Sequence, residues 1–198
     1  MKRLVLIAAF AVLPAARGLA QDPRLQARLD PLVARAVEAQ LDSARAARLP
    51  ADPLVRKALE GRTKGADGDR IVAAVRALRL ALADARALLG GAAQDAELMS
   101  GANALRAGIP STHILTLRRE RDGSLHVPLD IMTDLVARGV RPAEAATAVE
   151  RLVRQGRNDA DLVRLREQID QDIQTGLAPQ AALDRRLAGV PAAGPPRP

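Results

Sequence analysis

Two histidines, His113 and His126, are the only imidazoles in the chain. Asp130 follows His126 at a spacing of four residues, which would place both side chains on one face of a helix that includes them. Such a pair could provide two metal ligands, and His113 could supply a third, whereas zinc sites need three or four. Pro128 indicates, however, that the helix begins after His126. The sequence therefore favours an exposed polar stripe over a metal site.

The most distinctive short segment, residues 54–64, holds Lys57 and Lys64 with Glu60 between them. Glu60 and Lys64 have the i, i+4 spacing and the orientation that favour an ion pair on a helix. In one interpretation, a lysine of this segment binds a phosphate or carboxylate group, or acts as a base with a lowered pKa. The other, which the sequence favours, is a helix end whose basic residues lie near the negative end of the helix dipole, with a stop at Gly65.

The groups most often used in catalysis are scarce. The chain has no cysteine, Trp or Tyr, and its single Phe is Phe10. No serine lies in a Gly-x-Ser-x-Gly motif, and no phosphate-binding loop or dinucleotide fingerprint occurs. Glu167, Asp170 and Asp172 form an acidic cluster, but we expect Arg164 and Arg166 to neutralise it. We therefore expect no cofactor, and we favour a function other than catalysis.

Residues 1–20 have the features of a secretory signal peptide. Basic residues at positions 2 and 3 precede an apolar run over residues 4–13, and Gly18-Leu19-Ala20 offers small residues to a signal peptidase. As a helix, the run would span only about 15 Å of a hydrocarbon core of about 30 Å, so a retained membrane anchor is the less favoured interpretation. We expect export from a bacterial cell to the periplasm or beyond, with Gln21 as the first residue and no integral membrane segment left.

Arginine supplies nearly all of the positive charge. The formal net charge of +7 falls to +4 without residues 1–20, because that segment carries Lys2, Arg3 and Arg17 and no acid. The arginines alternate with acidic residues along the chain, which is typical of a solvated surface. Proteins that bind single-stranded nucleic acid stack the bases on aromatic side chains, and the mature chain has none. We therefore expect no nucleic-acid partner.

The apolar pattern predicts an all-α fold, namely a single compact domain over residues 21–188 with eight to nine helices packed as hairpins or as an irregular bundle. Apolar residues recur at steps of three and four, and no period-2 alternation persists. Three Asp-Pro pairs, beginning at Asp22, Asp30 and Asp52, indicate capped helix starts. Residues 189–198, rich in Pro, Gly and Ala, are expected to form a disordered tail. The expected helices cover residues 31–48, 53–63, 68–89, 95–107, 111–120, 128–138, 142–155, 159–175 and 179–188.

The helix junctions at Gly108, Gly139 and Gly176 resemble one another. In each, the glycine is followed by an apolar residue and, one or two positions later, by a proline. The pattern could mark an α-solenoid that binds proteins. The unequal spacing of the junctions favours a simpler explanation, in which separate helix ends converge on one kind of glycine cap.

The sequence thus favours an exported, non-enzymatic helical protein that binds another protein of the cell envelope as an adaptor, scaffold or chaperone. The alternative is a protein that binds an anionic small ligand or a lipid head group through arginine side chains; an enzyme ranks third. A protein-binding function requires an exposed apolar patch, whereas an anion-binding function requires a cavity on which arginines converge. The sequence leaves the ligand, the partner and the oligomeric state open.

Overall fold

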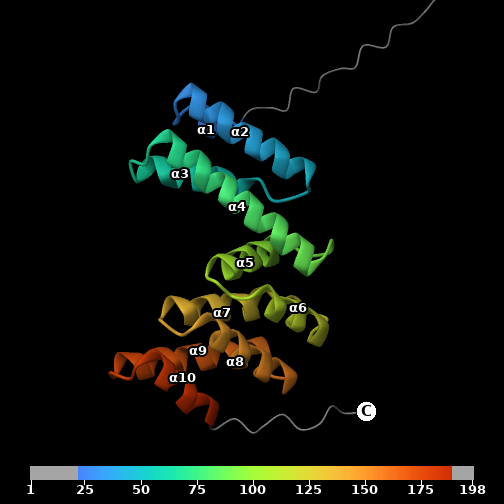
Figure 1. The fold of residues 1–198 in the computed structure, drawn as a ribbon, viewed down its shortest axis with the longest axis vertical. Coiled ribbons are helices and arrows are strands. Elements are labelled where there is room, and N and C mark those ends of the chain that lie inside the picture. Colours follow the sequence, from blue (N-terminus) through green and yellow to red (C-terminus); the bar gives the residue numbers. More distant parts are fainter. Residues whose placement is uncertain (1–21, 189–198) are drawn as a thin grey trace, which may run out of the picture.

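The computed structural model describes residues 22–188, and within this range every regular element is a helix (Figure 1). The all-α prediction is therefore confirmed, with one helix more than expected. The predicted signal peptide and the predicted tail lie outside the described residues. The helices are α1 (Pro23–Gln26), α2 (Pro31–Ala46), α3 (Asp52–Thr63), α4 (Gly68–Leu89), α5 (Asp95–Arg106), α6 (Ser111–Glu120), α7 (His126–Ala137), α8 (Pro142–Arg154), α9 (Asp159–Gln174) and α10 (Pro179–Ala188).

The three Asp-Pro pairs begin helices in three different ways. Asp22 caps α1 by accepting a hydrogen bond from the backbone N–H of Arg24 at 2.9 Å. Asp30 occupies the N-cap position of α2 without a side-chain cap bond. Asp52 is the first residue of α3 rather than its cap, and its carboxylate pairs with Arg24 and Arg56 instead. The predicted capping role is thus confirmed only for Asp22.

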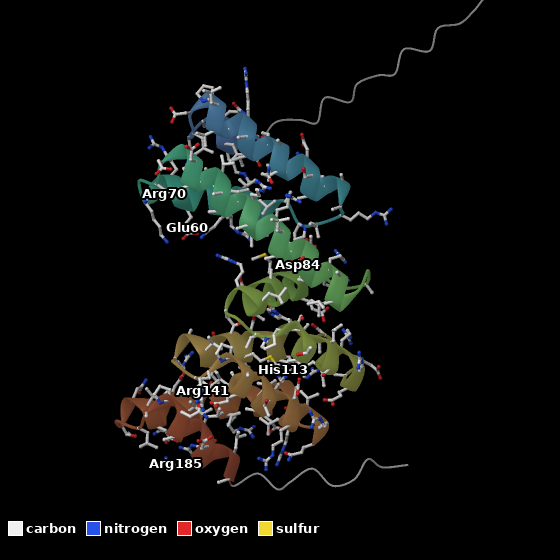
Figure 2. The ribbon with its side chains drawn as sticks, viewed as in Figure 1. Glu60, Arg70, Asp84, His113, Arg141 and Arg185 are labelled. Carbon is white, nitrogen blue, oxygen red and sulfur yellow. The ribbon has the colours of Figure 1, made fainter. Side chains whose placement is uncertain are left out.

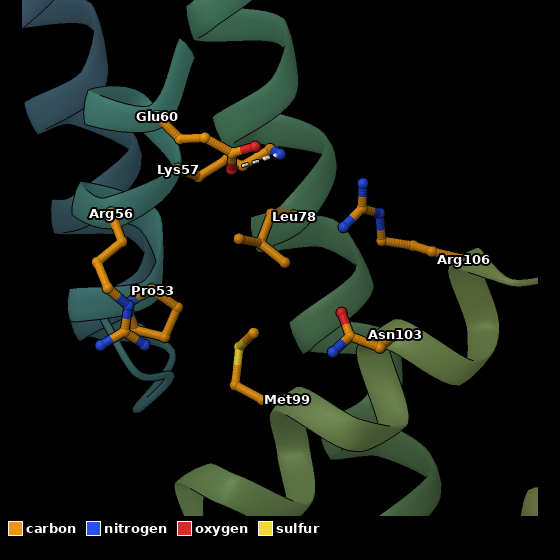
Figure 3. Close-up of a pocket in the computed structure, with 8 residues that line it drawn as sticks. All are labelled: Pro53, Arg56, Lys57, Glu60, Leu78, Met99, Asn103 and Arg106. Atoms are coloured by element: carbon orange, nitrogen blue, oxygen red, sulfur yellow. Dashed lines mark hydrogen bonds and ion pairs between the residues drawn. The ribbon is translucent and has the colours of Figure 1, made fainter. Parts of the chain in front are cut away.

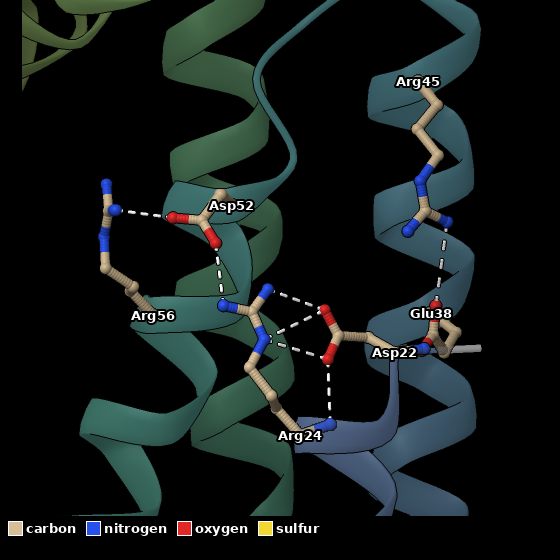
Figure 4. Close-up of polar contacts among 6 residues, drawn as sticks. All are labelled: Asp22, Arg24, Glu38, Arg45, Asp52 and Arg56. Atoms are coloured by element: carbon tan, nitrogen blue, oxygen red, sulfur yellow. Dashed lines mark hydrogen bonds and ion pairs between the residues drawn. The ribbon is translucent and has the colours of Figure 1, made fainter. Parts of the chain in front are cut away.

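These ion pairs belong to a polar network that fastens α1 to its neighbours (Figure 4). Arg24 bridges Asp22 and Asp52, and so links α1 to α3. The buried carboxylate of Glu38 on α2 accepts a hydrogen bond from the backbone N–H of Asp22. The network also holds the guanidinium of Arg56 on α3, which matters for the site described below.

The predicted helix ends are confirmed where glycine takes a positive φ. At the end of α7, Gly139 has φ +99°, and the backbone N–H of Val140 returns to the carbonyl oxygen of Leu135 at 3.1 Å. Only glycine adopts this conformation without strain, and a Cβ at this position would lie 3.3 Å from the Pro179 ring. Positive φ also occurs at Gly65, Gly90, Gly108, Gly156 and Gly176.

The helices form a stack in which each helix packs mainly against its first and second neighbours along the chain (Figure 1). One row is formed by α2, α4, α6 and α8, and α5, α7 and α9 form a second row beside it. This is the contact pattern of a tandem helical array. Helix α3 would extend the second row before α5, but it packs on α1, α2 and α4 and makes little contact with α5. The second row is therefore interrupted between α3 and α5.

The core of the described residues is built from Leu, Ile, Val, Met and Ala. The apolar stripe on α4, which includes Leu78 and Leu82, is buried, and so are Leu162, Leu165 and Ile169 on α9. Alanine side chains such as Ala85 on α4 lie against Gly101 of α5, which lets the two helices approach closely. No helix in residues 22–188 is both long enough and apolar enough to cross a membrane.

Candidate functional site

A pocket of about 250 Å³ opens where the second row of helices is interrupted (Figure 3). One face of α3 and one face of α5 line it, because the residues from each helix recur at steps of three and four. A single side chain of α4 lies between these two faces. The lining residues are Pro53, Arg56, Lys57 and Glu60 from α3, Leu78 from α4, and Met99, Asn103 and Arg106 from α5.

The inner part of the pocket is apolar. Leu78 and Pro53 are buried, and Met99 is half-buried beside them. In Figure 3 the Met99 side chain extends from α5 toward this part of the pocket. A bound molecule could therefore place a short apolar group here while its polar end stays nearer the solvent.

Lys57 and Glu60 form an ion pair at the α3 side of the pocket, with 3.0 Å between Nζ and Oε2. Lys64 pairs with the other oxygen of the same carboxylate, but its side chain is 71% exposed and does not line the pocket. The ammonium groups of Lys64 and Lys57 lower the pKa of Glu60 to about 2. Glu60 is therefore ionised at neutral pH and has no proton to donate as a general acid.

The α5 side of the pocket carries two polar side chains that have no hydrogen-bond or ion-pair partner among the described residues. Neither the guanidinium of Arg106 nor the side-chain amide of Asn103 forms a hydrogen bond or ion pair with another residue in the described range 22–188. Both side chains extend toward the space in front of Leu78 (Figure 3). Free N–H donors of this kind are suited to an oxyanion, and a guanidinium can bind a carboxylate or phosphate through two hydrogen bonds at once.

The charge of the lining suits the binding of an anion. Arg56, Lys57 and Arg106 bring three positive charges to the pocket, and Glu60 brings one negative charge. The lining holds no Ser, His or Cys that could serve as a nucleophile or base. The arrangement can attract and orient an anion.

The structure does not bring all three candidate metal ligands together. His113 on α6 pairs with Glu150 on α8 at 2.8 Å, whereas His126 on α7 contacts Ser100 on α5 and lies 3.4 Å from Asp130. Residues 22–188 contain no group of three or more His, Cys, Asp or Glu side chains placed to hold a metal ion.

The prediction that α7 begins after His126 is wrong. The helix begins at His126 rather than at Pro128, so His126 and Asp130 do share a face. Pro128 is the third residue of the helix, where the missing N–H leaves no helical hydrogen bond unmade.

Ser100, His126 and Asp130 have the residue types of a hydrolytic triad without its geometry. The Oγ atom of Ser100 lies 2.7 Å from Nδ1 of His126, and the carboxylate of Asp130 approaches the same nitrogen. A working triad uses both ring nitrogens, one for the serine and the other for the carboxylate. Ser100 is also only 2% exposed. This contact joins α5 to α7 and does not activate a nucleophile.

The acidic cluster of α9 is neutralised mainly by arginines outside this helix, and not by Arg164 and Arg166 as predicted. Asp170 pairs with Arg138 of α7, and Asp172 pairs with both Arg185 and Arg186 of α10. Only Glu167 has the expected partner, Arg166, at 3.8 Å. The carboxylates of α9 therefore serve as links between helices.

Protein-family models, curated proteins and solved structures yield no match to this chain. Function therefore has to be inferred from the geometry of the pocket. Sequence reasoning identified its α3 side through Lys57 and Glu60 but missed Asn103 and Arg106. The only available signal was their i, i+3 spacing on a helix with few other charges, which does not show what that helix faces.

Proposed function

We propose that this protein is an exported, non-enzymatic binding protein that holds an anionic small ligand in the pocket between α3, α4 and α5. The observation that carries the proposal is the convergence of Lys57 and Arg106 from two different helices on one cavity whose inner part is apolar. Convergence of cations on a cavity is what distinguishes an anion-binding function from an adaptor function. The ligand class is a carboxylate or phosphate attached to a short apolar group.

The size and lining of the pocket limit the ligand. A volume of about 250 Å³ is smaller than the ~300–1,000 Å³ typical of sites for drug-sized molecules. The oxyanion would lie against Arg106, Asn103 and Lys57, and the apolar part would cover Leu78 and Met99. Such a ligand replaces no existing ion pair of Arg106 and buries an apolar surface that is partly open to water.

An adaptor that binds another envelope protein is the alternative. It would need a broad apolar surface, and within residues 22–188 only Leu32 and Leu80 are large apolar side chains that are exposed. This observation makes the pocket the better supported site for a ligand.

The ligand class is tested by NMR titration of the full chain with inorganic phosphate, butyrate and hexanoate. We expect chemical-shift changes at Leu78, Asn103 and Arg106. Tighter binding of hexanoate than of butyrate would identify a carboxylate with an apolar chain, whereas binding of phosphate alone would identify a phosphate ligand. The absence of shifts at these residues with all three probes would overturn the proposal.

Two pairs of variants make the test specific. Arg106→Ala should weaken binding about tenfold, because a hydrogen bond to a charged group is lost, whereas Arg119→Ala, at an exposed arginine of α6, should not. Lys57→Ala should weaken binding, and Lys64→Ala should not. The lysine pair is well matched, because both residues bind Glu60 and only Lys57 lines the pocket.

Export rests on the sequence of residues 1–20 and stays part of the proposal. The intact mass of protein recovered from the envelope fraction of bacterial cells tests it. A mass that begins at Gln21 would support export and cleavage, and a mass that retains residues 1–20 would indicate an anchor.

A further inference from the structure

A groove of about 420 Å³ runs between α2 and α4 on a different part of the surface from the pocket. Ala36 lines it from α2, and the residues that line it from α4 are Asp69, Val72, Ala73, Arg76, Ala77 and Leu80. Leu80 is 46% exposed, and Leu32, one helical turn from Ala36 on α2, is 79% exposed. Of the two large apolar side chains that residues 22–188 expose, Leu80 therefore lines this groove, and Leu32 lies one helical turn before the α2 residue that lines it.

The exposed residues of α4 follow the spacing of a helix-pairing seam. Ala73, Ala77, Leu80, Asp84 and Ala87 are separated by alternating steps of four and three, and all five are exposed. This is the spacing that lets one helix pack along another as in a coiled coil. The buried residues of α4, such as Leu78 and Leu82, lie on the other faces of the helix and are already covered by this chain. The seam is thus a second packing face without a partner in the described range.

The two charged residues nearest to Leu80 on this face, Arg76 and Asp84, lie at equal distances along α4 on either side of it. Arg76 lies four residues before Leu80 and Asp84 four residues after it, and both are exposed. Neither side chain forms a hydrogen bond or ion pair with any residue among positions 22–188. Figure 2 shows Asp84 on α4.

This symmetry identifies the partner. If a second copy of α4 packs antiparallel on the first with Leu80 on the two-fold axis, each Arg76 faces Asp84 of the other copy. Around the same axis Ala77 faces Ala83, and Ala73 faces Ala87. A two-fold interface requires such self-complementarity, in which residue i meets residue j and residue j meets residue i. An unrelated partner helix would not require Arg76 and Asp84 to lie at equal distances on either side of one exposed leucine.

We propose that this protein forms a two-fold symmetric dimer through antiparallel packing of α4, with Leu80 at the centre and two Arg76–Asp84 ion pairs. The alanines around Leu80 let the helix axes approach closely, and Leu32 and Ala36 of α2 extend the apolar contact at the side. The dimer leaves the pocket between α3 and α5 untouched, so its test is independent of the ligand.

Charge exchange tests the pairing in sedimentation velocity runs on the full chain. Arg76→Asp and Asp84→Arg should each weaken self-association by at least tenfold, because each places like charges opposite one another twice. The double variant should restore the wild-type dissociation constant, because the charges are complementary again. A wild-type chain that stays monomeric, single variants that associate as wild type does, or a double variant that is not restored would each overturn the proposal.

Cross-linking tests the position of the axis. The chain has no cysteine, so Leu80→Cys introduces the sole thiol. A residue on the two-fold axis of closely packed helices lies within the Cα–Cα distance of about 4.4–6.8 Å that a disulfide needs. We expect mild oxidation to give a covalent dimer with Leu80→Cys and not with Ala143→Cys, at an exposed position of α8. Equal cross-linking of the two variants would overturn the proposed axis.

Discussion

The carboxylate of Asp172 on α9 accepts a hydrogen bond from Nε of Arg186 on α10 at 2.6 Å. Arg185 pairs with the same carboxylate, so one buried side chain holds two consecutive residues of the last described helix. Because α10 packs chiefly on α9, this contact is the main polar attachment of α10 to the stack.

We expect Asp172→Asn to lower the melting temperature by several degrees, because two guanidinium groups lose their counterion in a partly buried place. Circular dichroism melting measures the shift, and hydrogen exchange should show faster exchange of the α10 amides than of the α4 amides. Asp184→Asn on the exposed side of α10 is the matched control and should melt close to wild type. Unchanged exchange of α10 in the Asp172 variant would show that apolar packing alone holds this helix.

Acid should destabilise the protein below about pH 4. Hydrogen bonds from Arg186 lower the pKa of Asp172, and hydrogen bonds from Arg24 lower that of Asp22. A carboxylate whose pKa is lower in the folded state stabilises the fold above its unfolded pKa of about 4, and this contribution is lost as the pH falls through the folded pKa.

The free energy of urea unfolding should therefore change little from about pH 7 to about pH 5 and decrease between about pH 4 and about pH 2. Glu60, with a pKa of about 2, contributes at the lower end of this range. The Asp172→Asn variant should show a shallower decrease than wild type. A wild-type stability that is constant down to pH 2 would contradict the assignment of these ion pairs.

Charges placed in the core should prevent folding. Ile169 is fully buried and Leu78 is nearly so, and an unpaired buried charge costs several kcal/mol, which is comparable with the total stability of a small domain. We expect Ile169→Asp and Leu78→Asp to give little helical signal in circular dichroism. Arg79→Ala should stay folded, because it loses a single hydrogen bond to Gln40, worth about 1 kcal/mol. A wild-type melting curve for Leu78→Asp would mean that this face of α4 is not in the core.

Ser100 should be inert toward a fluorophosphonate probe, which labels activated serines. The side chain is buried, and its contact with Nδ1 of His126 competes with the carboxylate of Asp130 for one nitrogen. Mass spectrometry after incubation with the probe measures labelling at Ser100, with a known serine hydrolase as the positive control. Labelling of Ser100 would reopen the hydrolase interpretation.

The sequence predicted nine of the ten helices in the described residues because their periods and caps are local properties. Gly139 and Gly176 mark helix ends in both the prediction and the structure. For α1, the Asp22-Pro23 pair predicted only a helix start, because its four residues, Pro23–Gln26, are too few for an apolar period to appear. Pro128 was misleading because proline is tolerated in the first turn of a helix as well as before it.

The site was only half predictable, for a physical reason. Lys57 and Glu60 stand out because their interaction is within one helix. The role of Asn103 and Arg106 in lining the pocket can be recognised only when α5 is placed opposite α3. That placement depends on how both helices pack on α4. The partners of Asp170 and Asp172 were misassigned in the same way, since helix spacing reveals neighbours within α9 but not the arginines of α7 and α10.

Because each helix depends mainly on its first and second neighbours along the chain, the stack has a direction in which it can assemble. The first helices, α1 to α4, can pack on one another as soon as they have left the ribosome or an export channel, and α4 then offers its remaining surface to α5 and α6. Each following helix can then pack on helices that are already folded. A chain that emerges from its N-terminus therefore exposes unpacked apolar surface only at its most recently folded helix. The last helix, α10, is the latest to dock and the first able to detach, so loss of structure should begin at the C-terminal end of the stack.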